Sequence, residues 1–214
     1  FGFQTDGIFQ NQAEVNTYTN SNGGLIQPNA SPGDFRWKDT DGDGTISEKD
    51  RTFIGSPLPD YTFGFTLNIE YKGFDALVFG QGVTGNKIFQ GLRRLDIANA
   101  NYQTTALGRW TGEGTSNTFP RLTNNDPNNN FSNPSDFYLE DGDYFRIKTI
   151  QVGYSLPNVT IKQVGMTKAR IYITGENLFT FTEYTGYDPE IGGGIDKGYY
   201  PQAKTLMMGL NLQF

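Results

Sequence analysis

The twelve residues from Asp39 to Asp50 have the spacing of a calcium-binding loop. Carboxylates stand at the first, third, fifth and twelfth positions, Gly44 at the sixth permits a sharp turn, and the seventh position offers a backbone carbonyl. Hard oxygen donors at this charge density suit Ca²⁺. We therefore expect a structural calcium ion that stiffens an exposed loop, with its ligands drawn from Asp39, Asp41, Asp43, Thr45 and Asp50.

This loop departs from the usual EF-hand in two ways. Asp50 replaces the customary Glu at the twelfth position, and its shorter side chain can leave only one oxygen on the ion. Flanking helices are not indicated, because Trp37-Lys38 precedes the loop and the Pro-containing stretch 55–59 soon follows it. The alternative interpretation is a solvated acidic turn that holds no ion.

No residue pattern supports catalysis. The chain has no Cys and no His, which excludes imidazole acid–base chemistry and thiolate or His-ligated metal sites. The acids Asp188 and Glu190, like those in 140–143, lie beside Pro or Gly, which indicates solvated turn carboxylates rather than the facing pair of a hydrolase. Gly80–Gly85 spells a dinucleotide fingerprint, but the strand before it pairs in a hairpin and no βαβ unit follows. We predict that the chain is not an enzyme.

The composition favours a β-rich protein. Among 214 residues there are 27 Gly, 17 Phe and 12 Tyr, which suits many turns and the aromatic girdles of a membrane barrel. The formal net charge of −6 argues against a nucleic-acid partner, because phosphate binding draws on clustered Lys and Arg. No run of about 18 apolar residues predicts a transmembrane helix. The chain opens at Phe1 in patterned sequence, and we interpret it as a fragment.

Two segments alternate apolar and polar residues with the period of a β-strand. Residues 204–214 place every second residue on one apolar face, over about the ~9–11 residues that a tilted strand needs to cross a bilayer. Residues 62–71 alternate in the same way, and Lys72-Gly73 then forms a two-residue turn into a hairpin partner, residues 74–83.

Two further strands are expected before the terminal one, at 144–156 and from Ala169 towards Phe179. In the first, the apolar set changes phase between Ile147 and Ile150, which predicts a β-bulge. One helix is expected in the segment 88–110.

Long and short connections alternate along the chain, as in transmembrane barrels with short periplasmic turns and long extracellular loops. Five strands cannot close such a barrel, which needs about eight, so the rest of the wall must come from elsewhere. We predict an all-β chain that supplies about five C-terminal strands of a large antiparallel transmembrane β-barrel. Its expected parts are an extracellular loop with the calcium-type motif at 1–60, a barrel hairpin at 61–84, a long extracellular loop at 85–142, barrel strands at 143–180, an extracellular loop at 181–203 and the terminal strand at 204–214.

Short motifs follow one another along the whole chain in a fixed order. They include Thr5-Asp6-Gly7-Ile8-Phe9, the Asp39–Asp50 loop, Tyr71-Lys72-Gly73-Phe74-Asp75, Tyr144-Phe145-Arg146-Ile147-Lys148, Gly153-Tyr154-Ser155-Leu156-Pro157, Glu176-Asn177-Leu178-Phe179-Thr180, Tyr184-Thr185-Gly186-Tyr187-Asp188-Pro189-Glu190 and the strand Leu206–Phe214. The ordered set resembles the C-terminal part of SusC/RagA-type TonB-linked (TonB-dependent) outer-membrane transporters of Bacteroidota. Each motif is common alone, but their order is specific.

The resemblance implies a barrel of the 22-stranded class with a plug in its lumen, in the bacterial outer membrane. It also implies import of a bulky nutrient, a glycan before an oligopeptide, with energy from TonB and a SusD-like surface lipoprotein as a lid. The expected partners are the rest of the barrel and plug, that lipoprotein, TonB, outer-membrane lipid and the nutrient. Loop aromatics could contact substrate or lid, or could pack within the loops: Trp110, Tyr184, Tyr187, Tyr199 and Tyr200.

A second class of protein stays open, a secreted, calcium-stiffened β-sandwich that binds carbohydrate. A barrel exposes its outward face to lipid, whereas a sandwich buries the same face against a second sheet. The residues that distinguish the two are Phe63, Phe65, Leu67, Ile69, Leu206, Met208, Leu210 and Leu212.

Overall fold

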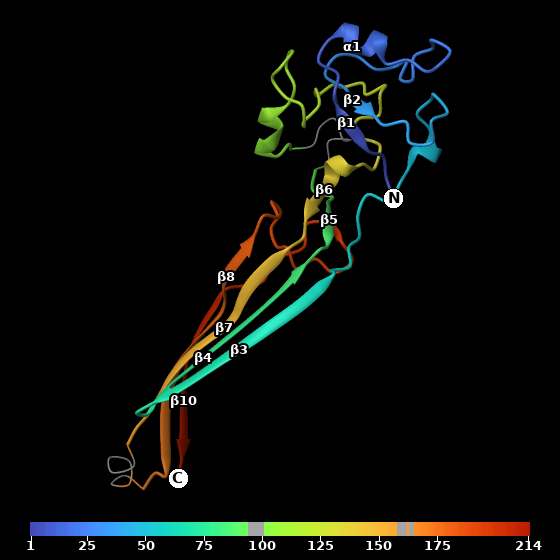
Figure 1. Ribbon diagram of the computed structural model, residues 1–214. Helices are drawn as coiled ribbons and strands as arrows, with labels where there is room; N and C mark the ends of the chain where they lie inside the picture. Colours follow the sequence, from blue (N-terminus) through green and yellow to red (C-terminus); the bar gives the residue numbers. More distant parts are fainter. Residues whose placement is uncertain (94–100, 158–161, 163–164) are drawn as a thin grey trace. The chain divides into compact units, whose positions relative to one another are not determined.

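The computed structural model describes residues 1–93, 101–157, 162 and 165–214 (Figure 1). The chain divides into two compact units. The sheet unit comprises Pro57–Ile88 and Glu140–Phe214, and the loop unit comprises Phe1–Ser56 and Phe89–Leu139. The segments expected to be separate extracellular loops, 1–60 and 85–142, therefore contribute most of their residues to one compact unit.

The sheet unit is built on one antiparallel sheet with the strand order β10-β8-β7-β4-β3 (Figure 1). The predicted hairpin is present, and Lys72 and Gly73 turn it with φ of 48° and 87°, as a tight two-residue turn requires. The predicted terminal strand is also present and pairs with β8. The strands are β3 (Tyr61–Tyr71), β4 (Phe74–Thr84), β7 (Tyr144–Ser155), β8 (Lys168–Thr182) and β10 (Thr205–Gln213).

Strand pairing sorts the side chains of this sheet into an apolar face and a polar face. Paired residues share a face because side chains alternate along each strand; Leu67 pairs with Val78, and Met208 pairs with Ile173. The apolar face comprises Phe63, Phe65, Leu67, Ile69, Ala76, Val78, Phe145, Ile147, Ile150, Val152, Ile171, Ile173, Phe179, Phe181, Leu206, Met208, Leu210 and Leu212.

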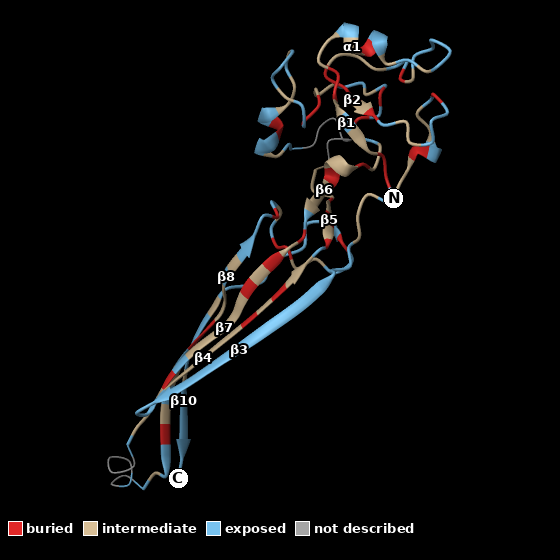
Figure 2. Ribbon diagram, in the orientation of Figure 1, coloured by how far each residue is buried: buried red, intermediate tan, exposed pale blue. Residues whose placement is uncertain are grey.

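The apolar face is uncovered. On the two edge strands its side chains are between 43% and 78% exposed, and Figure 2 shows β3 exposed throughout and β10 exposed over most of its length. Within the described residues of the sheet unit, no second sheet lies against this face.

The predicted bulge in β7 is confirmed. The register between β7 and β8 shifts between Ile147 and Thr149, and the pairing with β4 shifts between Phe79 and Gly80. The extra residue returns Ile150 to the apolar face that Ile147 occupies.

All long segments leave the sheet from one end, here called the loop-bearing end. The pairs Tyr61↔Thr84 and Tyr144↔Thr182 lie there, where β3 and β7 begin and β4 and β8 end. The turn at 72–73 lies at the opposite end, where β7 also ends at Ser155 and β8 begins at Lys168. This arrangement matches the predicted alternation of long and short connections.

The loop unit has little regular structure and two small aromatic cores. Phe3, Ile8, Phe35 and Trp37 are buried together, and the rings of Phe35 and Trp37 have centroids 5.3 Å apart. The second core contains Ala106, Phe119 and Phe131. The elements are β1 (Thr5–Ile8), α1 (Gln12–Thr17), β2 (Phe35–Trp37) and the 3₁₀ turns η1 (Glu48–Asp50), η2 (Thr104–Gly108) and η3 (Asp136–Tyr138).

Buried polar side chains replace regular ladders in the loop unit. Asn130 is fully buried, and it accepts from the Phe35 amide at 2.8 Å and donates to Asp34 Oδ1 at 2.9 Å. Asp34 is also fully buried and accepts two bonds from the Arg121 guanidinium, at 2.6 and 3.1 Å. A buried group that loses its partner costs free energy, so these bonds define the fold of the loop unit.

The remaining strands are short: β5 (Lys87–Gln90), β6 (Leu139–Asp141) and β9 (Ile195–Asp196), in the order β6-β5-β9. The prediction of a helix in 88–110 is wrong in the described part, because 87–90 is a strand and only 104–108 is helical, as a 3₁₀ turn. Burial of Ile88 and stacking of Phe89 on Tyr138 override the helical pattern; residues 94–100 lie outside the described part. Among the described residues, no helix combines the length and apolar character needed to cross a membrane.

Candidate functional site

The acidic loop brings three of its predicted ligands together. Asp39, Asp41 and Asp43 each offer a carboxylate oxygen within 4.8 Å of the others. The amides of Gly42 and Gly44 donate to Asp39 at 2.8 and 2.9 Å, and both glycines have positive φ, 75° and 85°. These turns aim alternate side chains to one side of the loop. The oxygen donors fit part of a Ca²⁺ shell, which takes six to eight ligands.

Asp50, the fifth predicted ligand, does not join these three carboxylates and instead binds backbone amides of the loop. Its side chain is fully buried, with Oδ1 accepting from the Thr40 amide and Oδ2 from the Ser47 amide, both at 2.7 Å. It thereby caps the 3₁₀ turn η1 and closes the base of the loop. Among the described residues, the carboxylates close enough to share a metal ion are those of Asp39, Asp41 and Asp43, here called the aspartate triad. Asp50 does not belong to this group.

Thr45 binds Asp43 through both of its donors. Its hydroxyl and amide donate to Asp43 Oδ1 at 2.7 and 3.0 Å. These bonds, first that of the hydroxyl, lower the pKa of Asp43 and keep it anionic. The anionic form of Asp43 is the form in which a carboxylate binds a cation.

Two of the five predicted contact aromatics have packing roles. Tyr184 is buried, and its hydroxyl donates to Asp196 Oδ2 at 2.6 Å. Trp110 is half-buried, packs against the first core and donates from Nε1 to Gln10 Oε1 at 3.1 Å. Their polar atoms face the protein itself.

The other three, Tyr187, Tyr199 and Tyr200, are 71%, 49% and 93% exposed. All lie in the segment between β8 and β10, here called the tyrosine loop (residues 183–204). Their rings are available to a ligand.

A buried ion-pair network ties the tyrosine loop to the polar face of the sheet. Arg146 projects from β7 and contacts Asp188 and Glu190, each at 2.7 Å, and Thr180 on β8 at 2.8 Å. Lys148 also donates to Glu190, at 2.8 Å. The arginine side chain is only 4% exposed, so the network anchors the loop from beneath.

This network corrects the interpretation of Asp188 and Glu190 as solvated turn acids. Asp188 is 5% exposed and also accepts from the Gln202 amide at 2.8 Å. Burial acts to raise the pKa of Asp188, but Arg146 and the amides of Gln202 and Glu190 outweigh it and lower that pKa. The sequence does contain a feature that could have predicted this network. Arg146 and Lys148 place two cations on the polar face of one strand, and buried cations require anionic partners.

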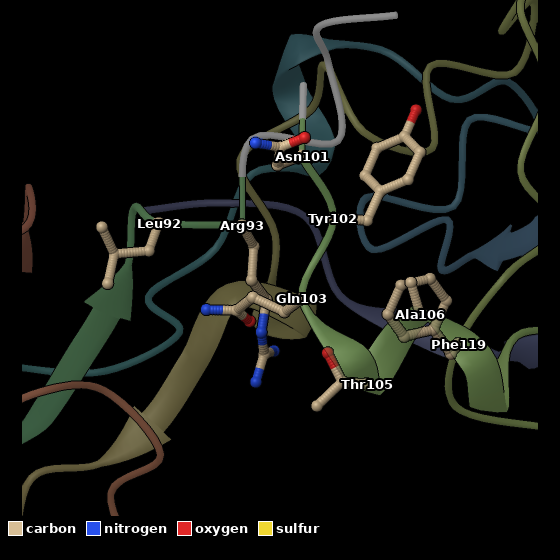
Figure 3. A pocket seen from close by; sticks show the side chains of 8 residues that line it. All are labelled: Leu92, Arg93, Asn101, Tyr102, Gln103, Thr105, Ala106 and Phe119. Carbon is tan, nitrogen blue, oxygen red and sulfur yellow. The ribbon is translucent and has the colours of Figure 1, made fainter. Parts of the chain in front are cut away.

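The cavity in Figure 3 belongs to the loop unit and is too small for a nutrient. Its volume is about 10 Å³, room for about one water molecule. Its lining residues are Leu92, Arg93, Asn101, Tyr102, Gln103, Thr105, Ala106 and Phe119.

Comparison with curated proteins identifies the family. No protein-family model matches the chain. The TonB-dependent receptor P3 of Formosa agariphila is 33% identical over 228 residues, which cover 100% of this chain and 22% of that receptor. The TonB-dependent receptor SusC of Bacteroides thetaiotaomicron is 30% identical over 194 residues, which cover 89% of this chain and 18% of SusC.

The chain belongs to the SusC/RagA family of TonB-dependent receptors. It spans about a fifth of the length of these curated relatives. Solved structures agree on the fold: the RagAB peptide importer in its open-open state matches with a TM-score of 0.74 at 23% identity, covering 100% of this chain and 22% of that one. A further RagAB peptide transporter structure matches with a TM-score of 0.71 at 26% identity, covering 85% and 21%.

For this SusC/RagA family member, the five-stranded sheet is a section of a large antiparallel transmembrane barrel, and the protein is located in the outer membrane. The curated relatives are TonB-dependent receptors, which supports the prediction that the chain is not an enzyme. The sandwich alternative is not favoured, because the apolar face is uncovered.

Proposed function

We propose that this chain supplies barrel wall and outer loops to an active importer of a bulky nutrient. In this proposal TonB delivers the energy, a SusD-like lipoprotein closes the mouth, and the plug and remaining strands come from the rest of the receptor. The observation that carries the proposal is the division of one sheet into an uncovered apolar face and a polar face that carries the ion pairs of Arg146 and Arg170. A wall between lipid and a polar lumen needs this division.

We further propose that the tyrosine loop contacts the nutrient or the lid. Tyr187, Tyr199 and Tyr200 combine exposed rings with hydroxyls, which suits the faces and hydroxyl groups of sugar rings. The loop's acids Asp188 and Glu190 are paired with Arg146 and Lys148 beneath, so they offer no free charge to attract a charged ligand, and the exposed rings suit an uncharged one. A glycan is therefore our first choice of cargo, and an oligopeptide is the competing one.

Uptake by the complete receptor tests both proposals. Cells lacking the receptor are complemented with the wild type, a Tyr199→Ala/Tyr200→Ala variant, or Tyr71→Ala as a control that removes an exposed tyrosine at the opposite end of the sheet. Labelled oligosaccharides and labelled oligopeptides are then supplied with and without a protonophore. We expect uptake of oligosaccharides that is sensitive to the protonophore, that the double variant reduces about tenfold and that the control variant leaves unchanged. The reason is that a sugar ring packed against an aromatic ring contributes ~1 kcal/mol or more of binding free energy.

Two other results would redirect the proposals. Uptake restricted to peptides would replace the glycan while keeping the importer. Uptake of neither class, together with no lipoprotein co-purifying from detergent-solubilised outer membranes, would overturn the transport role.

We also propose that Asp39, Asp41 and Asp43 hold a structural Ca²⁺, with the Thr45 carbonyl and water completing its shell and Asp50 closing the loop behind it. The support is the convergence of three carboxylates, whose ligand atoms lie within 4.8 Å of one another. Titration calorimetry on the intact receptor should show calcium binding that Asp41→Asn weakens about tenfold, because affinity follows the charge count of the ligands. Glu48→Gln, in the same loop but paired with Arg51, is the matched control. Equal affinities in all three proteins would mean that the acidic loop is a solvated turn.

A further inference from the structure

The apolar face ends in a ladder of phenyl rings near the loop-bearing end of the sheet. Phe63, Phe145 and Phe181 come from β3, β7 and β8, and neighbouring rings are stacked at 6.2 Å with interplanar angles of 8° and 16°. Gly80 and Gly82 on β4 make the ladder possible, since a Cβ at Gly80 would lie 2.7 Å from Phe145 and one at Gly82 would lie 2.8 Å from Phe63. The rings therefore lie flat across the intervening strand.

An open hollow of about 860 Å³ lies over this ladder. Its walls contain the three phenyl rings and the carboxylates of Asp143 and Glu183, with Asp141 beside them. The alternation of side chains along a strand explains why these acids lie beside the rings. Asp143 is two residues before Phe145 and Glu183 is two residues after Phe181, so each acid shares a face with its phenylalanine. The hollow is thus apolar on one side and acidic on the other.

The acidic side carries excess negative charge. Asp141 is paired with Lys87, while Asp143 accepts from the Thr84 hydroxyl and the Gly85 amide, neither of which is charged. Glu183 is exposed. Three carboxylates therefore stand against one ammonium group among these side chains, next to an apolar surface that spans four strands, from β3 to β8.

We propose that this hollow binds a membrane lipid with a primary ammonium headgroup, whose acyl chain lies along the phenyl ladder and whose ammonium group pairs with Asp143 and Glu183. Charge complementarity selects the headgroup: an ammonium group donates hydrogen bonds to carboxylates, a quaternary choline group has no N–H to donate, and a bare phosphate is repelled. The ladder selects an amphiphile over a free amine, because only a chain of methylene groups covers the rings. The inference rests on the membrane placement of the apolar face.

Native mass spectrometry of the intact receptor in detergent tests the site. The probes are an ethanolamine lipid and a choline lipid with identical acyl chains, titrated separately. We expect tighter binding of the ethanolamine lipid, by about fivefold, the size of one solvent-accessible ion pair. Equal binding of the two lipids would overturn the proposal.

Matched variants assign the preference to this hollow. Glu183→Gln should abolish most of the discrimination, whereas Glu70→Gln, an exposed acid on the polar face of β3 near the opposite end, should keep it. Phe181→Ser should weaken both lipids equally. A preference that survives Glu183→Gln would also overturn the ammonium site.

One further measurement distinguishes failure of the lipid site from failure of the membrane placement on which it rests. Spin labels on Leu67 and Leu210 report whether the apolar face meets lipid. Lipid contact at both labels without headgroup discrimination would remove this site alone, whereas labels in water would remove the membrane placement itself.

Discussion

The two units of this chain bury opposite kinds of side chain. In the sheet unit Met208 is 78% exposed while Arg146 is 3% exposed; in the loop unit Trp37 is 1% exposed. Apolar groups leave water wherever they can, so the sheet unit is arranged for lipid on its outer face and the loop unit for water. The difference teaches that exposure of apolar residues identifies the surrounding solvent of each unit.

The largest difference between the two units is expected when the core of the loop unit is disrupted. Trp37→Ala should destabilise that unit by ~3–5 kcal/mol, as loss of a large buried aromatic does. Limited proteolysis of the intact receptor should then cut within 1–56 or 89–139 while the sheet stays protected. Phe53→Ala is the control, because Phe53 is 62% exposed and should have little effect. Simultaneous loss of the sheet would show that the two units do not fold separately.

Breaking the buried ion pair should free the tyrosine loop. Arg146→Met leaves Asp188 buried without its cation, at a cost of about 3–5 kcal/mol. Hydrogen exchange should rise in 183–204 and stay low in β3 and β4. Lys148→Met is the milder control, since Glu190 would keep Arg146. Unchanged exchange in the loop of the Arg146 variant would show that other contacts hold it.

Charge placed on each face of one strand sharpens the comparison within the sheet. Leu67→Arg puts a cation on the apolar face at the middle of β3, at a cost of ~2–4 kcal/mol in lipid. Asn68→Arg puts the same cation on the polar face, where about 1 kcal/mol or less is expected. Denaturant unfolding of the receptor in vesicles measures both. Equal costs would contradict a lipid-facing and a lumen-facing side.

Acid should loosen the tyrosine loop before the rest of the sheet. Because the pKa of Asp188 is lowered in the fold, the contribution of this group is complete above its ordinary value of ~3.9 and is lost as pH falls through the lower, folded value. Loop exchange measured down to pH 3 should therefore rise in the wild type. Asp188→Asn should show a higher, pH-flatter baseline; an unaltered pH profile in that variant would assign the transition to another group.

The sheet was predictable from sequence because a period of two carries its information locally. The terminal strand, the hairpin at Lys72-Gly73 and the bulge after Ile147 all follow from neighbouring residues. The family was predictable from the order of short motifs, which needs no structure.

The loop unit was not predictable, because its bonds join distant residues without a periodic pattern. Thr5 donates to Asp136, and Gln27 donates to Asn128, across 131 and 101 positions of chain. The clustering of Asp39, Asp41 and Asp43 could be predicted from their spacing in the sequence. The burial of Asp50 could not, because an aspartate at the twelfth position is the same residue whether it caps a turn or binds an ion. The pairing of Arg146 with Asp188 was also not predictable, because the two residues are 42 positions apart in the sequence.

The most direct test of the central claim, that one face of this sheet meets lipid, is a spin-label scan of residues 205–213 in the intact receptor embedded in vesicles. The chain itself has no Cys, so single cysteines introduced there add no background from this segment. Collision rates with oxygen, which dissolves in lipid, should peak at Leu206, Met208, Leu210 and Leu212 and fall at the residues between them, while a polar nickel reagent gives the opposite pattern. Equal oxygen accessibility at all nine positions, or peaks at the alternate residues, would contradict a lipid-facing apolar face.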